Sequence, residues 1–455
     1  MRRELIHSDS ANRNAIAFFA GWAMDAAPFA NLRKPGYDIY IMYDYREVDP
    51  GLYTELLDRY DSVAVVAWSF GVAIANTLIT GDEEIRIAIN GTPLAVHDTK
   101  GIPHAYNNLT LRRLSPATLA TFYSRVFHDV DSVCLPSRPL DQLSEELRIF
   151  GSTRFPDPSH YWDKVYVSGA DLIFPTRNQL EGWEGFNPVT IPDGWHAVDF
   201  NHILQTDIIN KQAVGLRFTR RAESYDRHAD VQRQMAATLV EKCRDAGVGF
   251  DGKDILELGI GTGFLTRLYS KHNPASALAV DLADSSLLRR ILLASGCDFN
   301  GQIITADAER FIADRTDCYD VIISASTIQW FNSPKTFLSN AARALRKGGV
   351  LALSTFAPGT FHEVTDITGS SLSYHTAEWY AEAAPDCLKP LLMANESLTM
   401  TFANPRALLE HISKTGVNAI GDPGANVTLT RRLLKELSVD PKLTYNSIYL
   451  IFKKL

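Results

Sequence analysis

The chain has 455 residues, which is too long for one ordinary hydrophobic core, so we expect two domains. Hydrophobic residues make up 45% of it, as in soluble globular proteins, and its formal net charge is −8 at pH 7. This acidic balance argues against a nucleic-acid-binding protein, which usually has a basic face. No apolar segment approaches the ~20 residues that span a bilayer, and the opening MRRELIHSDS lacks the apolar run of a signal peptide. We therefore expect neither nucleic acid nor a membrane as a partner.

Five cysteines are scattered along the chain, and no two of them form a C-x-x-C pair. An odd number of cysteines without metal-ligand spacing is typical of reduced thiols in a cytoplasmic protein. The sequence thus predicts a cytoplasmic location, no disulfide framework and no metal site. The cysteines are Cys134, Cys243, Cys297, Cys318 and Cys387.

Short apolar, β-rich segments separated by polar turns fill most of the first half, as in a buried parallel sheet. These predicted strands are NAIAFFAGWAMD, YDIYIMYDYRE, SVAVVAWSFG, IRIAING and KVYVSGAD. Residues 105–155 differ, because their apolar positions recur at helical spacing. We predict an α/β domain over residues 1–207, in which residues 105–155 form an inserted helical lid.

One of these strands ends in AWSFG, residues 67–71, the small-x-Ser-x-Gly pattern of the nucleophile elbow in α/β-hydrolases. The sharp turn needs small residues two before and two after the serine, and Ala67 stands where glycine is more common. Ser69 is therefore a candidate nucleophile, although a serine here is also compatible with a simple turn. The backbone N–H groups of Trp22 and Phe70 would form the oxyanion hole.

An elbow serine requires an acid and then a histidine later in the chain. Asp171 ends the segment KVYVSGAD, in the loop after a predicted strand, and His196 lies in the loop IPDGWHAVDF. We predict that His196 is the general base for Ser69 and that Asp171 orients the histidine. Asp98 remains a rival acid. The rival histidines are His97, His104 and His160.

The second half starts a new α/β pattern. AESYDRHADVQRQMAATLVEKCRDAG, residues 222–247, predicts one long amphipathic helix, and strands then alternate with helices as in a parallel sheet. We place this domain at residues 212–455 and expect a short, stiff junction near residues 205–213. Residues after about 385 show no pattern from which we draw a prediction.

The segment DILELGIGTGFLT places three glycines at alternate positions after a predicted strand. Such a turn lets a ligand approach the backbone and opens a helix with free N–H groups, which suits a dinucleotide or S-adenosylmethionine. Asp281, at the end of ALAVD, would hold ribose hydroxyls, and Asp307, in ADAERF, would reach the adenine amino group, which favours S-adenosylmethionine; the alternative is a turn without a ligand. The predicted cofactor-binding residues are Glu257, Gly259, Gly261, Gly263, Asp281 and Asp307.

Two sets of motifs resemble known families. GWAMD, AWSFGV, GADLIFPTRNQ and GWHAVDF, within residues 10–205, resemble the BioG-type pimeloyl-[acyl-carrier protein] methyl ester esterase. RFTRRAESYDRHADVQRQMA, SASTIQWF and LRKGGVLALSTFAPGTFHE, within residues 214–455, resemble the BioC-type malonyl-[acyl-carrier protein] O-methyltransferase. The resemblance implies an α/β-hydrolase joined to a class I, Rossmann-like methyltransferase, with S-adenosylmethionine as methyl donor and acyl carrier protein as partner in biotin biosynthesis. It also implies that residues 225–234 cap the donor site.

The two implied reactions oppose each other, since one forms a methyl ester and the other cleaves one. A free carboxylate is costly in the apolar pocket of a chain-elongating enzyme, and the ester hides that charge. The carboxylate is already ionised at neutral pH, so its methylation needs no general base. The esterase must spare the short malonyl ester, and four further buried methylenes on the pimeloyl chain would supply about 3 kcal/mol of discrimination. Lid residues that would contact the chain, or form only the lid's own core, are Leu119, Phe122, Tyr123 and Phe127.

Arginines are candidates for binding anions in both halves, although each is equally compatible with an ordinary surface position. Those that would orient the malonyl carboxylate are Arg217, Arg220 and Arg221, and those that would meet an acidic carrier protein are Arg112, Arg113, Arg125, Arg148 and Arg154. Two other functions stay open. One is a general carboxylesterase joined to a methyltransferase for small carboxylic acids, and the other is a carrier-docking protein with one inactive site.

Overall fold

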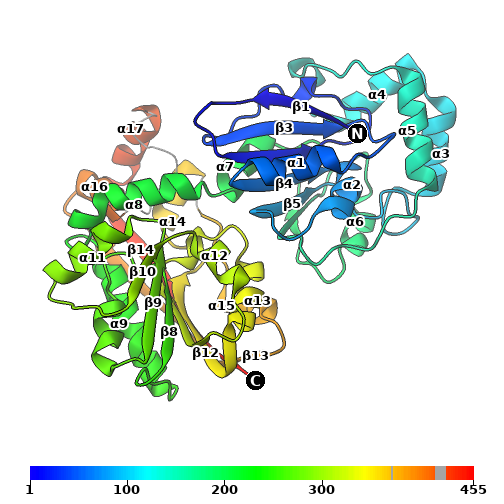
Figure 1. Ribbon diagram of the computed structural model, residues 1–455. Helices are drawn as coiled ribbons and strands as arrows, with labels where there is room; N and C mark the ends of the chain where they lie inside the picture. Colours follow the sequence, from blue (N-terminus) through cyan, green and yellow to red (C-terminus); the bar gives the residue numbers. More distant parts are fainter. Residues whose placement is uncertain (370–371, 416–426) are drawn as a thin grey trace. The chain divides into compact units, whose positions relative to one another are not determined.

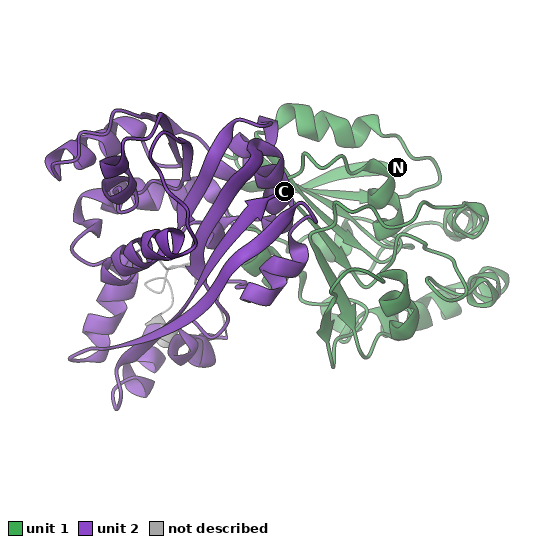
Figure 2. Ribbon diagram, turned by 90° about the horizontal axis from the view of Figure 1, so that it is seen from below, with its two compact units in different colours: residues 1–208 green, residues 209–455 purple. Residues whose placement is uncertain are grey.

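The computed structural model describes residues 1–369, 372–415 and 427–455. The chain divides into two compact units, residues 1–208 and 209–455, drawn in green and purple in Figure 2. Each unit has its own β-sheet with flanking helices, so the predicted α/β class is confirmed for both halves.

The first unit, described throughout, is built on a sheet in the order β1-β3-β2-β4-β5-β6-β7, in which β1 alone runs antiparallel to its neighbour (Figure 1). Its strands are β1 (Arg2–His7), β2 (Asn14–Phe19), β3 (Tyr37–Tyr43), β4 (Ser62–Trp68), β5 (Ile85–Ile89), β6 (Lys164–Ser168) and β7 (Val189–Ile191). β2, β3 and β5 are buried along their whole length, as expected for parallel strands covered on both faces. The strand order reverses at β2, which lies between β3 and β4, and ligand sites commonly lie at the carboxyl ends of strands at such a switch point.

The helices of this unit include an insertion between β5 and β6, where the sequence predicts a lid. They are η1 (Ala27–Phe29), α1 (Gly51–Arg59), α2 (Gly71–Leu78), α3 (His104–Arg113), α4 (Pro116–Val126), η2 (Val130–Ser132), α5 (Leu140–Ser152), α6 (Thr176–Gly182) and α7 (Phe200–Asp207). The inserted helices α3, α4 and α5 are cyan in Figure 1. α4 begins with a capping box, in which the Ser115 side chain accepts from the backbone of Thr118 and the Thr118 side chain accepts in return.

The second unit has a sheet in the order β10-β9-β8-β11-β12-β14-β13. Its strands are β8 (Asp254–Leu258), β9 (Ser276–Asp281), β10 (Gln302–Thr305), β11 (Tyr319–Ala325), β12 (Leu345–Phe356), β13 (Leu388–Thr401) and β14 (Lys442–Lys454). The strands β8 to β12 pair in parallel, and β14 is antiparallel to both β12 and β13. β8 lies between β9 and β11, which creates a second switch point, and β13 and β14 occupy part of the region for which the sequence supports no prediction.

The prediction of one long helix over residues 222–247 is wrong. The helices of this unit are α8 (Lys211–Tyr225), α9 (Asp230–Asp245), α10 (Thr266–Tyr269), η3 (Ser270–His272), α11 (Ser285–Ala294), α12 (Ala308–Phe311), η4 (Ile312–Asp314), η5 (Ile328–Trp330), α13 (Pro334–Ala344), α14 (His362–Thr368), α15 (Ala377–Ala383), α16 (Pro405–Thr415) and α17 (Val427–Glu436). α8 and α9 are separated at Asp226, whose carboxylate accepts from Arg267 at 2.8 Å and whose carbonyl accepts from Arg233. These contacts with side chains stabilise a break that the apolar periodicity does not reveal.

Within the described ranges, no helix is long and apolar enough to cross a membrane, and no cluster of three or more His, Cys, Asp or Glu side chains could hold a metal ion. All five cysteines are free thiols.

Candidate active sites

A serine in a strained turn follows β4, at the switch point of the first sheet. Ser69 has a φ of 58°, in the left-handed region that non-glycine residues rarely adopt, and α2 begins two residues later. A Cβ atom on Gly71 would lie 2.2 Å from the carbonyl oxygen of Phe19, so only glycine fits there. This is the geometry that the AWSFG pattern predicts.

The structure brings Ser69, His196 and Asp171 together in one hydrogen-bonded chain. Nε2 of His196 lies 2.9 Å from Oγ of Ser69, and Nδ1 of His196 lies 2.9 Å from Oδ2 of Asp171. The serine is 5% exposed and the histidine 1% exposed, so this chain is almost completely shielded from water. The arrangement allows His196 to take the serine proton while Asp171 fixes the imidazole tautomer.

Asp171 is held by donors that the sequence does not reveal. Its Oδ1 accepts from the backbone N–H groups of Ile173 and Phe174, both at 2.8 Å, and its Oδ2 accepts from Nε2 of Gln179 at 3.0 Å. Gln179 is fully buried on α6 and also donates to the carbonyl of Phe174. These donors satisfy the carboxylate and aim its second oxygen at His196.

The backbone of His196 is fixed from the other side. Its carbonyl accepts from the Trp68 indole at 2.7 Å and from the Asn90 side chain at 2.8 Å. The Trp68 ring also packs on the imidazole, with 5.1 Å between ring centroids. Trp68 therefore positions the histidine, a role that its place beside the serine in AWSFG does not reveal.

The predicted oxyanion-hole residues flank the serine turn. Trp22 follows β2 and Phe70 follows Ser69, and neither backbone N–H has a hydrogen-bond partner in this fully described unit. The rival residues are occupied elsewhere. His104 pairs with the exposed Asp98, His97 accepts from the backbone of Thr99 and Lys100, and His160 packs on Tyr161.

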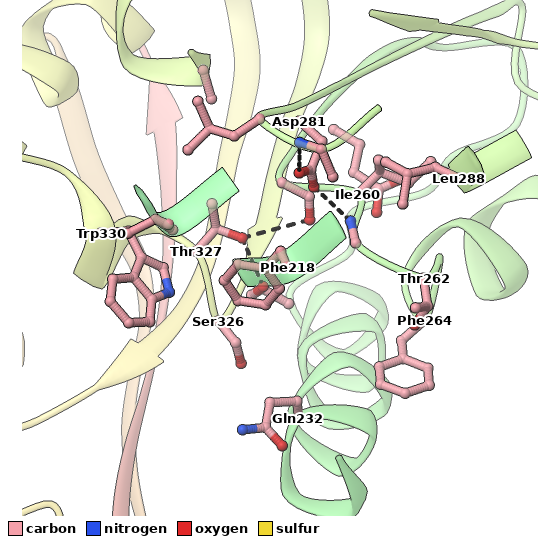
Figure 3. Close-up of a pocket in the computed structure, with 18 of the residues that line it drawn as sticks. Phe218, Gln232, Ile260, Thr262, Phe264, Asp281, Leu288, Ser326, Thr327 and Trp330 are labelled. Carbon is pink, nitrogen blue, oxygen red and sulfur yellow. Dashed lines mark hydrogen bonds between the residues drawn. The ribbon is translucent and has the colours of Figure 1, made fainter. Parts of the chain in front are cut away.

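A cavity opens at the carboxyl ends of β8, β9 and β11 in the second unit (Figure 3). Small-molecule sites commonly lie at this edge of a parallel sheet, beside a switch point. Of the predicted cofactor-binding residues, those that line it are Glu257, Gly259, Gly261, Asp281 and Asp307. Gly263 lies outside the lining; its φ of 89° favours glycine, and a Cβ there would lie 2.2 Å from Leu292. None of Arg217, Arg220 and Arg221 is among the lining residues.

The glycine turn gives this cavity open space at the backbone. A Cβ on Gly261 would have no atom within 4 Å, and the residue has a φ of 51°. Its N–H donates to Oδ2 of Asp281 at 2.8 Å, and Oδ1 of Asp281 accepts from Ala283 at 2.9 Å. Burial raises the pKa of Asp281 above its ordinary value, and these backbone donors oppose the rise.

Glu257 lies at the base of the cavity, at the end of β8. Its Oε2 accepts from the hydroxyls of Thr266 and Tyr269, at 2.6 and 2.8 Å. Burial dominates over these bonds and raises the pKa of Glu257 to about 8. A cation bound in the cavity would stabilise the ionised form of this carboxyl group.

Helix α8 covers the cavity with apolar side chains, including Phe218, and its first residue closes one end. The Lys211 ammonium lies 2.9 Å from Asp307 and also pairs with Glu309. Asp307, which the sequence analysis assigned to adenine, thus already holds a buried cation. The predicted cap, residues 225–234, contributes Tyr225 and Gln232 to the lining, and α8 extends the cap upstream.

The cavity fits S-adenosylmethionine by the chemistry of its lining. Oγ1 of Thr262 and Oε1 of Gln232 are buried at the lining and have no hydrogen-bond partner in the described part of the chain. Figure 3 shows Gln232 and Ser326 among the side chains that line the cavity. Polar atoms without partners, buried carboxylates and aromatic walls suit a ligand with an adenosyl group, a charged amino-acid end and a sulfonium.

The fold and these two sites describe a two-unit enzyme, with a hydrogen-bonded serine, histidine and aspartate in the first unit and a cavity that fits S-adenosylmethionine in the second. Residues 3–207 match the family model described as "Pimeloyl-ACP methyl esterase BioG", and residues 256–353 match "Methyltransferase domain". A malonyl-[acyl-carrier protein] O-methyltransferase of Bacteroides fragilis is 30% identical over 97% of this chain and 93% of its own length. The chain therefore belongs to the malonyl-[acyl-carrier protein] O-methyltransferase family and carries a BioG domain in its first half, as the motif resemblance predicts.

Other similar proteins cover one half each. The malonyl-[acyl-carrier protein] O-methyltransferase of Haemophilus ducreyi is 31% identical over 47% of this chain and 82% of its own length. The crystal structure of BioG from Haemophilus influenzae is 29% identical, covers 44% of this chain and 94% of its own, and aligns with a TM-score of 0.38.

Proposed function

We propose that this chain is a bifunctional enzyme of biotin biosynthesis. Its second unit methylates the free carboxylate of malonyl-[acyl-carrier protein] with S-adenosylmethionine, and its first unit hydrolyses pimeloyl-[acyl-carrier protein] methyl ester to the free acid and methanol. The observation that carries this proposal is the presence, in one chain of this family, of a hydrogen-bonded Ser69–His196–Asp171 chain and a cavity lined by Gly261 and Asp281.

In the proposed hydrolysis, Oγ of Ser69 attacks the ester carbonyl as Nε2 of His196 removes its proton. The carbonyl oxygen becomes negative and is stabilised by the N–H groups of Trp22 and Phe70. The imidazolium, held by Asp171, then gives its proton to the departing methoxide, which leaves as methanol. A water molecule activated by the same histidine cleaves the acyl-serine.

In the proposed methylation, S-adenosylmethionine supplies a methyl group activated by its sulfonium. Gly261 would leave room for the ligand beside the backbone, and Asp281 would bind its ribose. The chain's main task is to align the acceptor carboxylate, because this anion needs no base. The lining residues Gln232 and Ser326 would lie beside the reacting groups.

Acyl carrier protein is the proposed partner, and the exposed lid arginines Arg112, Arg113, Arg125, Arg148 and Arg154 offer it a cationic surface. The five free thiols support the cytoplasm as the compartment.

Mass spectrometry of two carrier-bound substrates tests the proposal. Malonyl-carrier protein with S-adenosylmethionine should gain one methyl group in wild type and in Ser69→Ala, but not in Gly261→Arg, whose side chain would fill the donor cavity. Pimeloyl-carrier protein methyl ester should lose its methyl group in wild type and in Gly261→Arg, but not in Ser69→Ala. Turnover of free acids and simple esters alone would instead support the general carboxylesterase and small-acid methyltransferase.

A further inference from the structure

The turn that carries one oxyanion-hole N–H is held by the lid. Ala23 follows Trp22 and has a φ of 65°, a conformation that strains a residue with a side chain. Its carbonyl accepts from the hydroxyl of Tyr123 in α4 at 3.0 Å. The Trp22 indole donates to the Leu143 carbonyl in α5 at 3.0 Å, and its ring packs edge-on against Phe122, with 4.9 Å between centroids. Strain of this kind persists where surrounding contacts fix it, so the turn depends on the lid.

The other parts of the catalytic centre also touch the lid. The ring of Phe70, the second oxyanion-hole residue, packs on Phe150 of α5 with 4.4 Å between centroids. The residue after His196, Ala197, donates its backbone N–H to Val126 at the end of α4, at 3.0 Å. A displacement of α4 would therefore disturb both the oxyanion hole and the histidine loop.

The two lid helices are attached to the unit differently. Arg138, just before α5, pairs with Asp44 at 2.9 Å and with Glu146 of α5 at 2.8 Å, and Glu146 also accepts from the backbone of Tyr45. The side chains of Arg138, Asp44 and Glu146 are buried and form one ionic cluster, and removing one member of such a cluster is strongly destabilising. This cluster anchors α5. α4 is attached through aromatic packing and the two hydrogen bonds of Tyr123 and Val126, and it has no ion pair to the rest of this fully described unit.

We propose that Tyr123 is a specificity-determining residue that links the seating of a long acyl chain beneath α4 to the position of the Trp22 N–H. This inference rests on the proposed esterase function. A seven-carbon chain lying against Phe122 and Phe127 keeps α4 in the observed position, in which Tyr123 fixes the strained Ala23 turn and completes the oxyanion hole. A three-carbon malonyl ester places fewer methylenes against α4, so it stabilises this position of α4 less and is hydrolysed more slowly.

The test is the removal of one hydroxyl group. Tyr123→Phe keeps the packing of α4 but loses the bond to Ala23. With the full-length protein and carrier-bound methyl esters of three-, five- and seven-carbon diacids, we expect kcat for the seven-carbon ester to fall about fivefold at unchanged KM, the loss expected from one buried hydrogen bond. The rate for the three-carbon ester should change less than twofold, so the preference for long chains decreases.

Two further variants distinguish this link between chain seating and the oxyanion hole from a general loss of activity. Tyr60→Phe removes a buried hydroxyl that donates to Asp38 at 2.6 Å at the opposite end of the sheet, and it should leave the chain-length profile unchanged. Ala23→Gly removes the strain, so adding Tyr123→Phe to it should cost less than twofold.

Equal losses for all chain lengths in Tyr123→Phe, or a change confined to KM, would overturn the inference. A wild-type protein that fails to hydrolyse the seven-carbon ester would overturn the proposed function instead. Methyl transfer by the second unit is measured for each variant, to check that the protein is folded.

Discussion

The buried carboxyl group of Glu257 should make the stability of the second unit fall as the pH rises. Burial raises its pKa from an ordinary value of 4.5 to about 8. The folded unit therefore binds this proton more tightly than the unfolded chain does. As the pH rises from 4.5 to about 8, the free energy of unfolding decreases. At 1.36 kcal/mol per pH unit, the interval corresponds to at most about 5 kcal/mol, of which about 3 kcal/mol falls between pH 5.5 and 8.

Glu257→Gln mimics the protonated carboxyl, because the amide keeps an oxygen that accepts from Thr266 and Tyr269. Relative to wild type, we expect this variant to become more stable by about 3 kcal/mol on going from pH 5.5 to 8.5. Urea titrations read by pulse proteolysis measure this, because fragments of the second unit can be followed separately. The matched control is Glu363→Gln, since Glu363 also accepts two hydrogen bonds, from the backbone and hydroxyl of Thr444.

If wild type and Glu257→Gln lose stability in parallel over this pH range, Glu257 is already ionised in the folded protein at pH 5.5 and the burial argument is wrong. If the stability of Glu363→Gln changes with pH as much as that of Glu257→Gln, the pH dependence is a general property of carboxylates in this unit and is not specific to Glu257.

Three other variants test the sites. Asp171→Asn should lower kcat for ester hydrolysis about 10⁴-fold, because it disfavours the required histidine tautomer, and a loss below tenfold in steady-state assays would refute its role. Gln179→Leu should lower the same kcat about fivefold through the lost bond to Asp171, with methyl transfer unchanged as the internal check. Lys211→Met leaves Asp307 and Glu309 without their buried cation, so urea titration should show a loss of about 3–5 kcal/mol in the second unit; an unchanged midpoint would contradict this.

The parts of each site that depend on local geometry could be predicted from the sequence. The elbow around Ser69 needs small neighbours at fixed offsets, and the order of the acid and the histidine follows from the order of strands in the fold. The glycine turn at Gly261 could likewise be predicted, because it depends only on consecutive residues. The structure places these residues where the motifs indicate.

Contacts between distant segments could not be predicted in this way. Gln179 reaches Asp171 across a loop, and Tyr123 meets Ala23 from 100 positions away, so neither spacing nor composition reveals them. The break between α8 and α9 depends on Arg267, 41 positions from Asp226. Gly263 is a case in which a local pattern was misleading. Its place in the glycine pattern predicted ligand binding, but in the structure it lies against the side chain of Leu292.

One experiment tests most directly whether this single chain both makes and removes methyl esters without undoing its own product. Malonyl-carrier protein, pimeloyl-carrier protein methyl ester and S-adenosylmethionine with a deuterated methyl group are incubated together with wild-type protein and followed by mass spectrometry. We predict that the malonyl species gains a labelled methyl group and keeps it while the pimeloyl species loses its unlabelled one. Malonyl methyl ester that accumulates with Ser69→Ala but disappears with wild type would contradict the account.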